Sequence, residues 1–119
     1  MTHGEFAYNV RSVPDMAIID LEGDIDSFAQ SAIQAAYSQA ESQDPRTIGL
    51  NFSRVHYINS TGIALLVGLL GQARQSGRRM AAYGLSDHYL EIFEITRLSD
   101  FIDIYPDEEG AIANRQATS

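Results

Sequence analysis

The segment HYINSTGIALLVGLL, residues 56–70, joins a short strand-like run to an almost wholly apolar, helix-like run. A helix start leaves four backbone N–H groups without intrahelical partners and carries partial positive charge. Asn59 or Ser60 can cap these groups with a side-chain oxygen, and Gly62 lets another group approach the first turn. The segment therefore predicts a helix that begins near Ser60, with the hydroxyl side chains of Ser60 and Thr61 at its start.

The predicted helix is apolar on more than one side. The spacing i, i+3, i+4 and i+7 predicts a face that covers a sheet, formed by Ile63, Leu66, Val67 and Leu70. Leu65 and Leu69 form a second apolar stripe, which can pack on a neighbouring helix or remain available to a partner. The helix is expected to end near Ser76, with Gly77 directly after it.

Strand-like and helix-like segments alternate along the rest of the chain. Strands are predicted at 6–11, 17–23, 46–52, 78–84 and 101–105. Helices are predicted from Ser27 to about residue 43, at 60–76, at about 87–96 and, briefly, after Pro106. Ser27 and Gln30 match a capping box, and the first helix has apolar residues at helical spacing: Ala29, Ile33, Ala36, Tyr37 and Ala40.

This order predicts an α/β fold. Strands that are separated by helices pair in parallel through right-handed crossovers, whereas the first two strands are joined by a short turn and are expected to pair antiparallel at an edge. We expect a mostly parallel five-stranded sheet with an antiparallel edge strand and three to four helices. The 119 residues fit one domain, with a core at about 5–113 and a loose tail at 114–119.

Composition excludes several functional classes. Acidic residues outnumber basic ones 16 to 8, and every basic residue is an arginine, which argues against nucleic-acid binding and membrane docking. The chain has no lysine for a Schiff base and no cysteine for thiol chemistry. It starts without a signal-peptide pattern, and its longest apolar run, Ile63 to Leu70, is too short to span a membrane. We therefore expect a cytoplasmic protein.

Three motifs, in order along the chain, carry a likeness to a known family. IDLEGDIDSFAQSAI (19–33) contains a pattern L-x-G-x-[LI]-D before a helix, and INSTGIALLVGLL (58–70) is close to D-S-[ST]-G-[LI] at a helix start. IFEITRLSDFIDIYPDEEGAI (92–112) is similar to F-x-[IM]-[TS]-G-L-x-x-x-[IF]-x-[IV]. Together they resemble the STAS domain family of anti-sigma-factor antagonists over roughly residues 5–113, which implies a single STAS-like α/β domain.

The resemblance implies a regulatory binding protein and not an enzyme. In that family, a partner that is both anti-sigma factor and serine kinase phosphorylates the motif serine, and a PP2C-type phosphatase resets it. The unmodified antagonist sequesters the partner. Carried over, Ser60 is the phosphoacceptor and Thr61 the second candidate. The implied partner-binding surface comprises Asp24, Asp26, Asn59, Ser60, Thr61, Gly62 and Leu65, and no cofactor is expected.

The sequence departs from the family pattern at two positions. Asn59 stands where the family has an aspartate, so the sequence leaves open a STAS protein that binds without being phosphorylated. Arg97 stands where a glycine often ends the third helix, which we interpret as a local variation of the helix end. The first departure keeps an alternative open: a STAS scaffold, or an accessory subunit of a signalling assembly or an ABC-type lipid transporter.

Other interpretations concern titratable residues. A serine hydrolase would use Ser60 as nucleophile with His56 or His88 as base, but the sequence lacks G-x-S-x-G. His3, His56 and His88 lack a metal-ligand spacing, and no metal site is expected. Asp24 and Asp26 form either part of the docking surface or a solvated acidic turn that stabilises the first helix. The acidic cluster of Asp107, Glu108 and Glu109 is interpreted as a favourable helix start.

Overall fold

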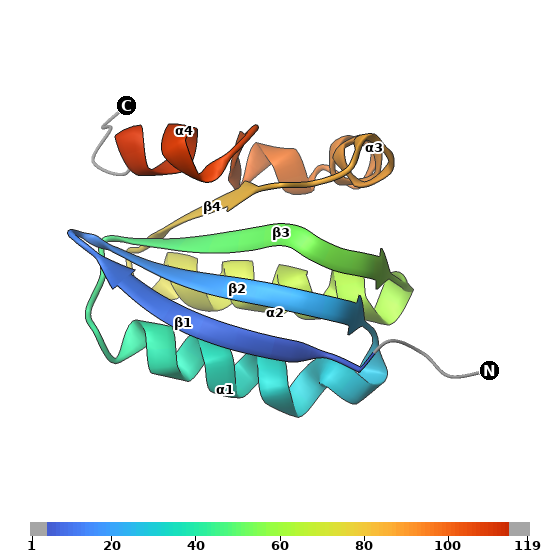
Figure 1. Cartoon of the computed structure of the whole chain (residues 1–119), viewed down its shortest axis with the longest axis horizontal. Helices are drawn as coiled ribbons and strands as arrows, with labels where there is room; N and C mark the ends of the chain where they lie inside the picture. The colour runs from blue at the N-terminus through green and yellow to red at the C-terminus, as the bar shows by residue number, and fades with distance from the viewer. Residues whose placement is uncertain (1–4, 115–119) are drawn as a thin grey trace.

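The computed structural model describes residues 5–114, which form a five-stranded mixed sheet with helices on both faces (Figure 1). β1 (Ala7–Val13) and β2 (Met16–Ile25) are antiparallel. β3 (Thr47–Ile58), β4 (Arg79–Tyr83) and β5 (Asp103–Tyr105) then add in parallel, so that the strand order equals the chain order. The predicted fold class, including the antiparallel edge strand, is confirmed.

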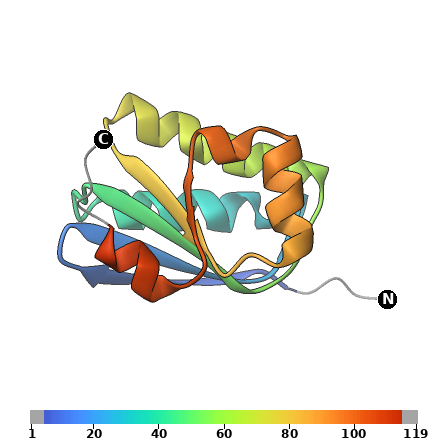
Figure 2. The ribbon, with the colours of Figure 1, turned by 90° about the horizontal axis from the view of Figure 1, so that it is seen from above.

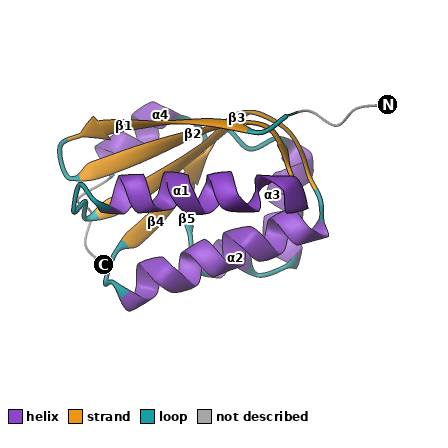
Figure 3. Ribbon diagram, turned by 90° about the horizontal axis from the view of Figure 1, so that it is seen from below, coloured by secondary structure: helices purple, strands orange, loops and turns teal. Residues whose placement is uncertain are grey.

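Four α-helices connect or follow these strands. They are α1 (Gln30–Glu41), α2 (Ser60–Gln75), α3 (Asp87–Ile95) and α4 (Glu108–Ala113). Two short 3-10 turns, η1 (Ser27–Ala29) and η2 (Leu98–Asp100), precede α1 and β5. α1 and α2 run side by side across one face of the sheet (Figure 3), and α4 lies across the other face (Figure 2).

The main core lies between the sheet and the α1–α2 layer. All five apolar positions predicted for the first helix are buried, as their helical spacing requires: Ala29, Ile33, Ala36, Tyr37 and Ala40. Phe52 from β3 meets Phe93 from α3 edge to face, with ring centroids 5.8 Å apart. α1 and α2 also contact each other through paired side-chain amides, because Gln34 and Gln72 exchange hydrogen bonds of 3.1 and 2.9 Å.

The predicted sheet-covering face of α2 is wrong in one residue. Val67 is 51% exposed, and the buried stripe continues instead through Leu66, Leu69, Leu70 and Ala73. Leu65 is half-buried and packs against the same core. A helix with few polar residues offers no hydrophilic side from which its orientation can be read, so its spacing fits several rotations about its axis.

A second, smaller core lies beneath α4. It joins Met16 and Ile18 of β2 to Ala81 and Tyr83 of β4 and to Ala111 of α4. Polar groups close its edge: Arg11 donates to Asp20 at 2.7 Å and to Glu108 at 2.6 Å. Asp107 caps α4 by accepting the Gly110 N–H at 2.9 Å. The interpretation of the acidic cluster as a helix start is therefore confirmed.

Several helix ends differ in detail from their predictions. The first helical segment is capped by Asp26, whose Oδ1 accepts the Phe28 N–H at 3.0 Å, so the capping box predicted at Ser27 is wrong. Gly77 ends α2 with φ +70°, as predicted. Arg97 follows α3 with φ +67°, a conformation that a glycine adopts at less cost.

Two strand boundaries also differ, and part of the chain lies beyond the structure. β3 continues to Ile58, six residues beyond its predicted end at 52, while β5 begins at Asp103 and not at 101. Of the predicted loose tail at 114–119, Asn114 donates to the Gly110 carbonyl at 2.8 Å, and the rest lies outside the described residues. Between residues 5 and 114, no helix combines the length and hydrophobicity needed to cross a membrane.

Candidate functional site

The ends of β2 and β3 bring two segments of the candidate site together. Ile25 pairs with Ile58, and Asp24 pairs with Tyr57. The Asn59 N–H then donates to the Ile25 carbonyl at 3.2 Å. These contacts place the acidic segment after β2 beside the hydroxyl pair at the start of α2, although 33 positions separate Asp26 from Asn59 in the sequence.

Gly62 sets how closely the two segments approach. It is buried in the first turn of α2, and a Cβ added there would overlap with the carbonyl oxygen of Ile25 and lie 2.9 Å from a methyl carbon of Ile58. Only a residue without a side chain leaves room for this backbone contact. The expectation that Gly62 admits another group is confirmed, and that group is the end of β2.

Asn59, and not Ser60, is the N-cap of α2. Its Oδ1 accepts the Gly62 N–H at 2.8 Å, and its carbonyl accepts the Ile63 N–H at 2.9 Å. Ser60 and Thr61 are exposed on the first turn. Within residues 5–114, their backbone N–H groups have no protein acceptor, so the helix start retains two donors that face solvent.

Asp24 and Asp26 do not form the solvated turn that we considered. Each is only 9% exposed. The carboxylate of Asp26 accepts the Phe28 N–H, which stabilises the start of the first helical segment. Asp26 therefore shapes the segment that follows β2, and both aspartates expose little of their own surface.

Two aromatic side chains at this end are exposed, and no motif in the sequence predicted their exposure. Phe28, on the turn after Asp26, is 79% exposed, and Tyr57, two residues before Asn59, is 53% exposed. Exposed aromatic residues are frequent anchors of protein interfaces. Leu65 lies one helical turn beyond Thr61 and is half-buried in the groove between α1 and α2.

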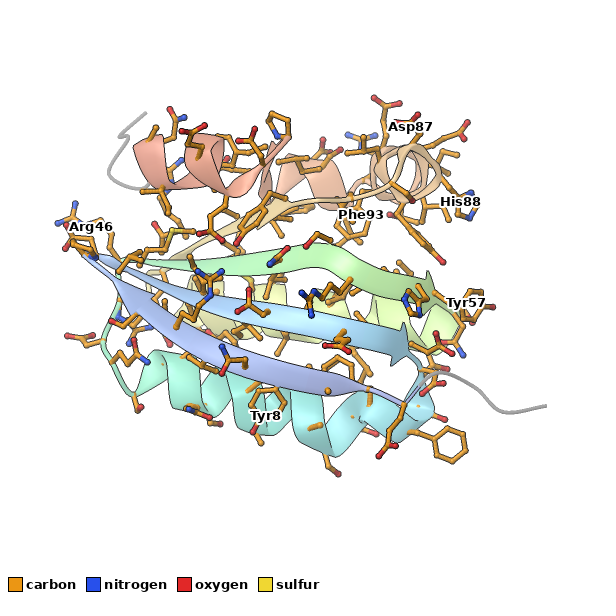
Figure 4. The ribbon with its side chains drawn as sticks, viewed as in Figure 1. Tyr8, Arg46, Tyr57, Asp87, His88 and Phe93 are labelled. Atoms are coloured by element: carbon orange, nitrogen blue, oxygen red, sulfur yellow. The ribbon has the colours of Figure 1, made fainter. Side chains whose placement is uncertain are left out.

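α3 also supports the site, through a hydrogen bond to the end of β3. The hydroxyl oxygen of Tyr89 accepts the Ile58 N–H at 2.8 Å, directly before Asn59. Tyr57 and His88 both lie at this end of the molecule (Figure 4). The junction between β3 and α2 is thus held in place by the side chain of Tyr89, which lies about thirty residues later in the sequence.

The histidines are not arranged around Ser60. His56 and His88 are exposed, and within the described residues neither forms a hydrogen bond to the Ser60 hydroxyl. His3 lies outside the described residues. Among residues 5–114, no three histidine, cysteine or acidic side chains are grouped as ligands of a metal ion.

The fold and this site define a class of protein. Residues 7–111 match the STAS domain, and the chain belongs to the STAS domain family. A curated relative, the anti-sigma-B factor antagonist of Listeria monocytogenes, is 31% identical over 86 residues, which cover 72% of this chain and 75% of the relative. In all, 17 curated proteins match this chain.

Solved structures show the same fold. The Bacillus cell-fate determinant SpoIIAA in its phosphorylated form superimposes with a TM-score of 0.70 and 25% identity, covering 91% of this chain and 98% of SpoIIAA. SpoIIAA, described as an anti-sigma factor antagonist, in its unphosphorylated form gives a TM-score of 0.73 and 24% identity, covering 94% of this chain and 100% of SpoIIAA. The STAS fold predicted from the three motifs is confirmed.

Proposed function

We propose that this chain is an anti-sigma factor antagonist whose association is switched at Ser60. In its unmodified form it binds a cytoplasmic anti-sigma factor that is also a serine kinase, and so frees a sigma factor. The kinase phosphorylates Ser60, the complex separates, and a PP2C-type phosphatase restores the unmodified form. The relatives named as anti-sigma-B factor antagonists, and a SpoIIAA structure in the phosphorylated form, support this proposal.

The observation that carries the proposal is the exposure of Ser60 on the first turn of α2. A kinase needs an accessible hydroxyl, and Ser60 is exposed. The N–H groups of Ser60 and Thr61 face solvent, so they can donate to phosphate oxygens. The positive end of the helix dipole favours the added charge. The fold can therefore accept a phosphate here without unfolding.

The same phosphate would change the docking surface. It adds about −1.5 to −2 charge near Asp24, at the end of the adjacent strand β2, and Asp26, directly after that strand. We propose that the partner contacts Ser60, Thr61, Asn59 and Leu65, with Phe28 and Tyr57 as aromatic anchors. Asp24, Asp26 and Gly62 hold the two segments in position, since they are themselves largely buried. Charge repulsion and bulk at Ser60 would then weaken the complex.

The test is phosphorylation by the cognate anti-sigma factor kinase. With ATP, mass spectrometry should locate one phosphate on Ser60. Ser60→Ala should abolish it, whereas Thr61→Ala and Ser38→Ala, at an exposed serine of α1, should retain it. Ser60→Asp should bind the unmodified partner more weakly than wild type does. A phosphate on Thr61 alone, or a Ser60→Asp variant that binds as tightly as wild type, would contradict the proposed switch.

A second candidate, a scaffold that is not phosphorylated, is favoured by one observation at Asn59. Its amide is neutral, and its Oδ1 is already occupied by the Gly62 N–H. An amide oxygen in this position is a poor acceptor for the Ser60 proton. On the scaffold hypothesis, Ser60 stays unmodified with the cognate kinase, and Asn59→Asp restores phosphate transfer. If wild type and Asn59→Asp react equally fast, the asparagine is a substitution without effect on the switch.

A further inference from the structure

Half of the arginines of this acidic chain are gathered at one end of the molecule. The chain carries 16 acidic and 8 basic residues. Four of the eight arginines line a single depression of about 540 Å³, and they are Arg46, Arg74, Arg78 and Arg79. Arg46 precedes β3, and Arg74 lies in the last turn of α2. Arg78 directly precedes β4, and Arg79 begins it. This arginine pocket lies at the opposite end of α2 from Ser60, and Figure 4 shows Arg46 far from Tyr57.

Two of these arginines are already paired with carboxylates. Arg79 donates to Asp103 at 2.8 Å. Arg78 lies 3.2 Å from Asp44 and 3.6 Å from Glu41, and it also donates to the Pro45 carbonyl at 2.5 Å. These ion pairs hold the start of β4 against the α1–β3 connection. They leave little positive charge of Arg78 and Arg79 for a ligand.

Arg46 and Arg74 are different. Neither forms an ion pair with any residue in the described range 5–114. The Arg74 guanidinium lies 5.3 Å from the centroid of the Phe101 ring, which holds it at the rim. The two carboxylates that line the pocket are both engaged by arginines, Asp103 by Arg79 and Asp100 by Arg97 at 2.7 Å. The pocket therefore keeps a positive surplus.

The carbonyl oxygens at the C-terminal end of α2 do not repel an anion in this pocket. Helix C-termini normally present carbonyl oxygens and negative partial charge. Here the Arg78 N–H donates to the Ala73 carbonyl at 2.8 Å, and the Gly77 N–H donates to the Arg74 carbonyl at 3.1 Å. The carbonyls of Ala73 and Arg74 are thus hydrogen-bonded inside the protein. The apolar floor, formed by the buried residues Leu70, Ala73 and Met80, keeps water away from one side and strengthens electrostatic attraction.

We propose that the arginine pocket binds a compact anion that carries at least two phosphate or carboxylate groups. The guanidinium groups of Arg46 and Arg74 bind it, because arginine presents a planar fork of donors to such groups. Arg78 and Arg79 shape the wall. The proposal is independent of the Ser60 switch, which lies at the other end of the helix, so either can fail without the other.

The test is an NMR titration of the full chain with pyrophosphate and, separately, with citrate, at constant ionic strength maintained with chloride. We expect saturable shifts of backbone amides around Arg46, Gly77, Arg79 and Asp103 with at least one of the two anions. Saturation by pyrophosphate alone assigns a phosphate-bearing ligand, and saturation by citrate alone assigns a carboxylate-bearing one. Shifts that stay linear with both anions would overturn the proposal.

Matched variants distinguish binding of the anion in the arginine pocket from nonspecific attraction between the anion and the protein surface. Arg46→Gln and Arg74→Gln each remove one charge from an exposed side chain, and each should weaken binding by roughly tenfold. Arg54→Gln removes the same charge from β3, outside the pocket, where the side chain is 79% exposed, and it should bind as wild type does. Equal weakening by all three variants would show diffuse attraction and overturn the assigned site. Circular dichroism confirms that each variant is folded.

Discussion

At the scale of a residue, the site depends on Gly62 more than on any group that could react. Its missing side chain allows the first turn of α2 to touch the Ile25 carbonyl at the end of β2. That contact, together with the Asn59 N–H donated to the same carbonyl, holds the hydroxyl pair beside the segment of Asp24 and Asp26. Elsewhere in α2, glycine has no such role, since Cβ atoms at Gly68 and Gly71 would meet nothing within 4 Å.

The first prediction compares two glycines of the same helix. Gly62→Ala should lower the free energy of unfolding by about 1–3 kcal/mol, because the added methyl group overlaps with the Ile25 backbone, which cannot move without distorting β2. Gly68→Ala should raise it by about 0.5–1 kcal/mol, because alanine favours a helix and finds open space there. Urea denaturation followed by circular dichroism measures both. A Gly62→Ala variant as stable as Gly68→Ala would refute the close contact.

At the scale of elements, local sequence patterns predicted features that depend on one segment alone, such as the buried face of a helix and the position where it begins. The burial of α1 followed from its helical spacing, and the start of α2 followed from capping residues around residue 60. The choice between Asn59 and Ser60 as cap stayed open because both side chains accept hydrogen bonds. The cap at Ser27 was wrong for a related reason: Asp26 is an equally good cap one residue earlier.

What could not be predicted arises between elements. β3 extends seven residues beyond its last pairing with β4, at Asn51, and its outer part pairs with β2 alone. Its residues Ser53 to Tyr57 are mostly exposed, so they lack the apolar pattern of a strand. The burial of Asp24 and Asp26 likewise has no local signal in the sequence. The arginine pocket collects residues from three separate segments of the chain.

The second prediction concerns the link between α3 and the site. Tyr89→Phe removes the hydroxyl oxygen that accepts the buried Ile58 N–H and should cost about 1–3 kcal/mol of stability, because that donor is left unsatisfied. Amide hydrogen exchange at Ile58 should accelerate by more than exchange elsewhere in β3. Tyr57→Phe, at an exposed side chain, is the control and should leave both measurements unchanged. Unaltered exchange at Ile58 in Tyr89→Phe would show that α3 does not hold the site.

At the scale of the whole molecule, ion pairs and hydrogen bonds hold α4 against the sheet. Arg11 of β1 bridges Asp20 of β2 and Glu108 of α4, and the Tyr83 hydroxyl donates to Glu108 at 2.5 Å. The hydrogen bonds from Arg11 lower the pKa of Asp20 and of Glu108. Burial, and then the hydrogen bond to Glu108, raises the pKa of Tyr83. Residues about a hundred positions apart in the sequence are thereby joined over the smaller core.

The last prediction is that the stability contributed by the Arg11 ion pairs with Asp20 and Glu108 is lost in acid. A carboxyl group whose pKa is lower in the folded state stabilises the fold above its ordinary pKa, and the contribution is lost as the pH falls towards the folded value. The ordinary values are 3.8 for Asp20 and 4.5 for Glu108, so stability should fall as the pH drops below these values. Glu108→Gln should cost about 1 kcal/mol or less near neutral pH, since the pair is partly exposed.

Glu109→Gln provides the matched control for that prediction, because Glu109 is exposed on the same first turn of α4. Urea midpoints between neutral pH and acid should change less steeply in Glu108→Gln than in wild type, whereas Glu109→Gln should follow wild type. The difference arises because only Glu108 gives up a hydrogen-bonded partner on protonation. If Glu108→Gln and Glu109→Gln gave the same profile, α4 would be held by its apolar contacts with Met16, Ile18 and Tyr83 alone, and the ion pairs would contribute nothing measurable.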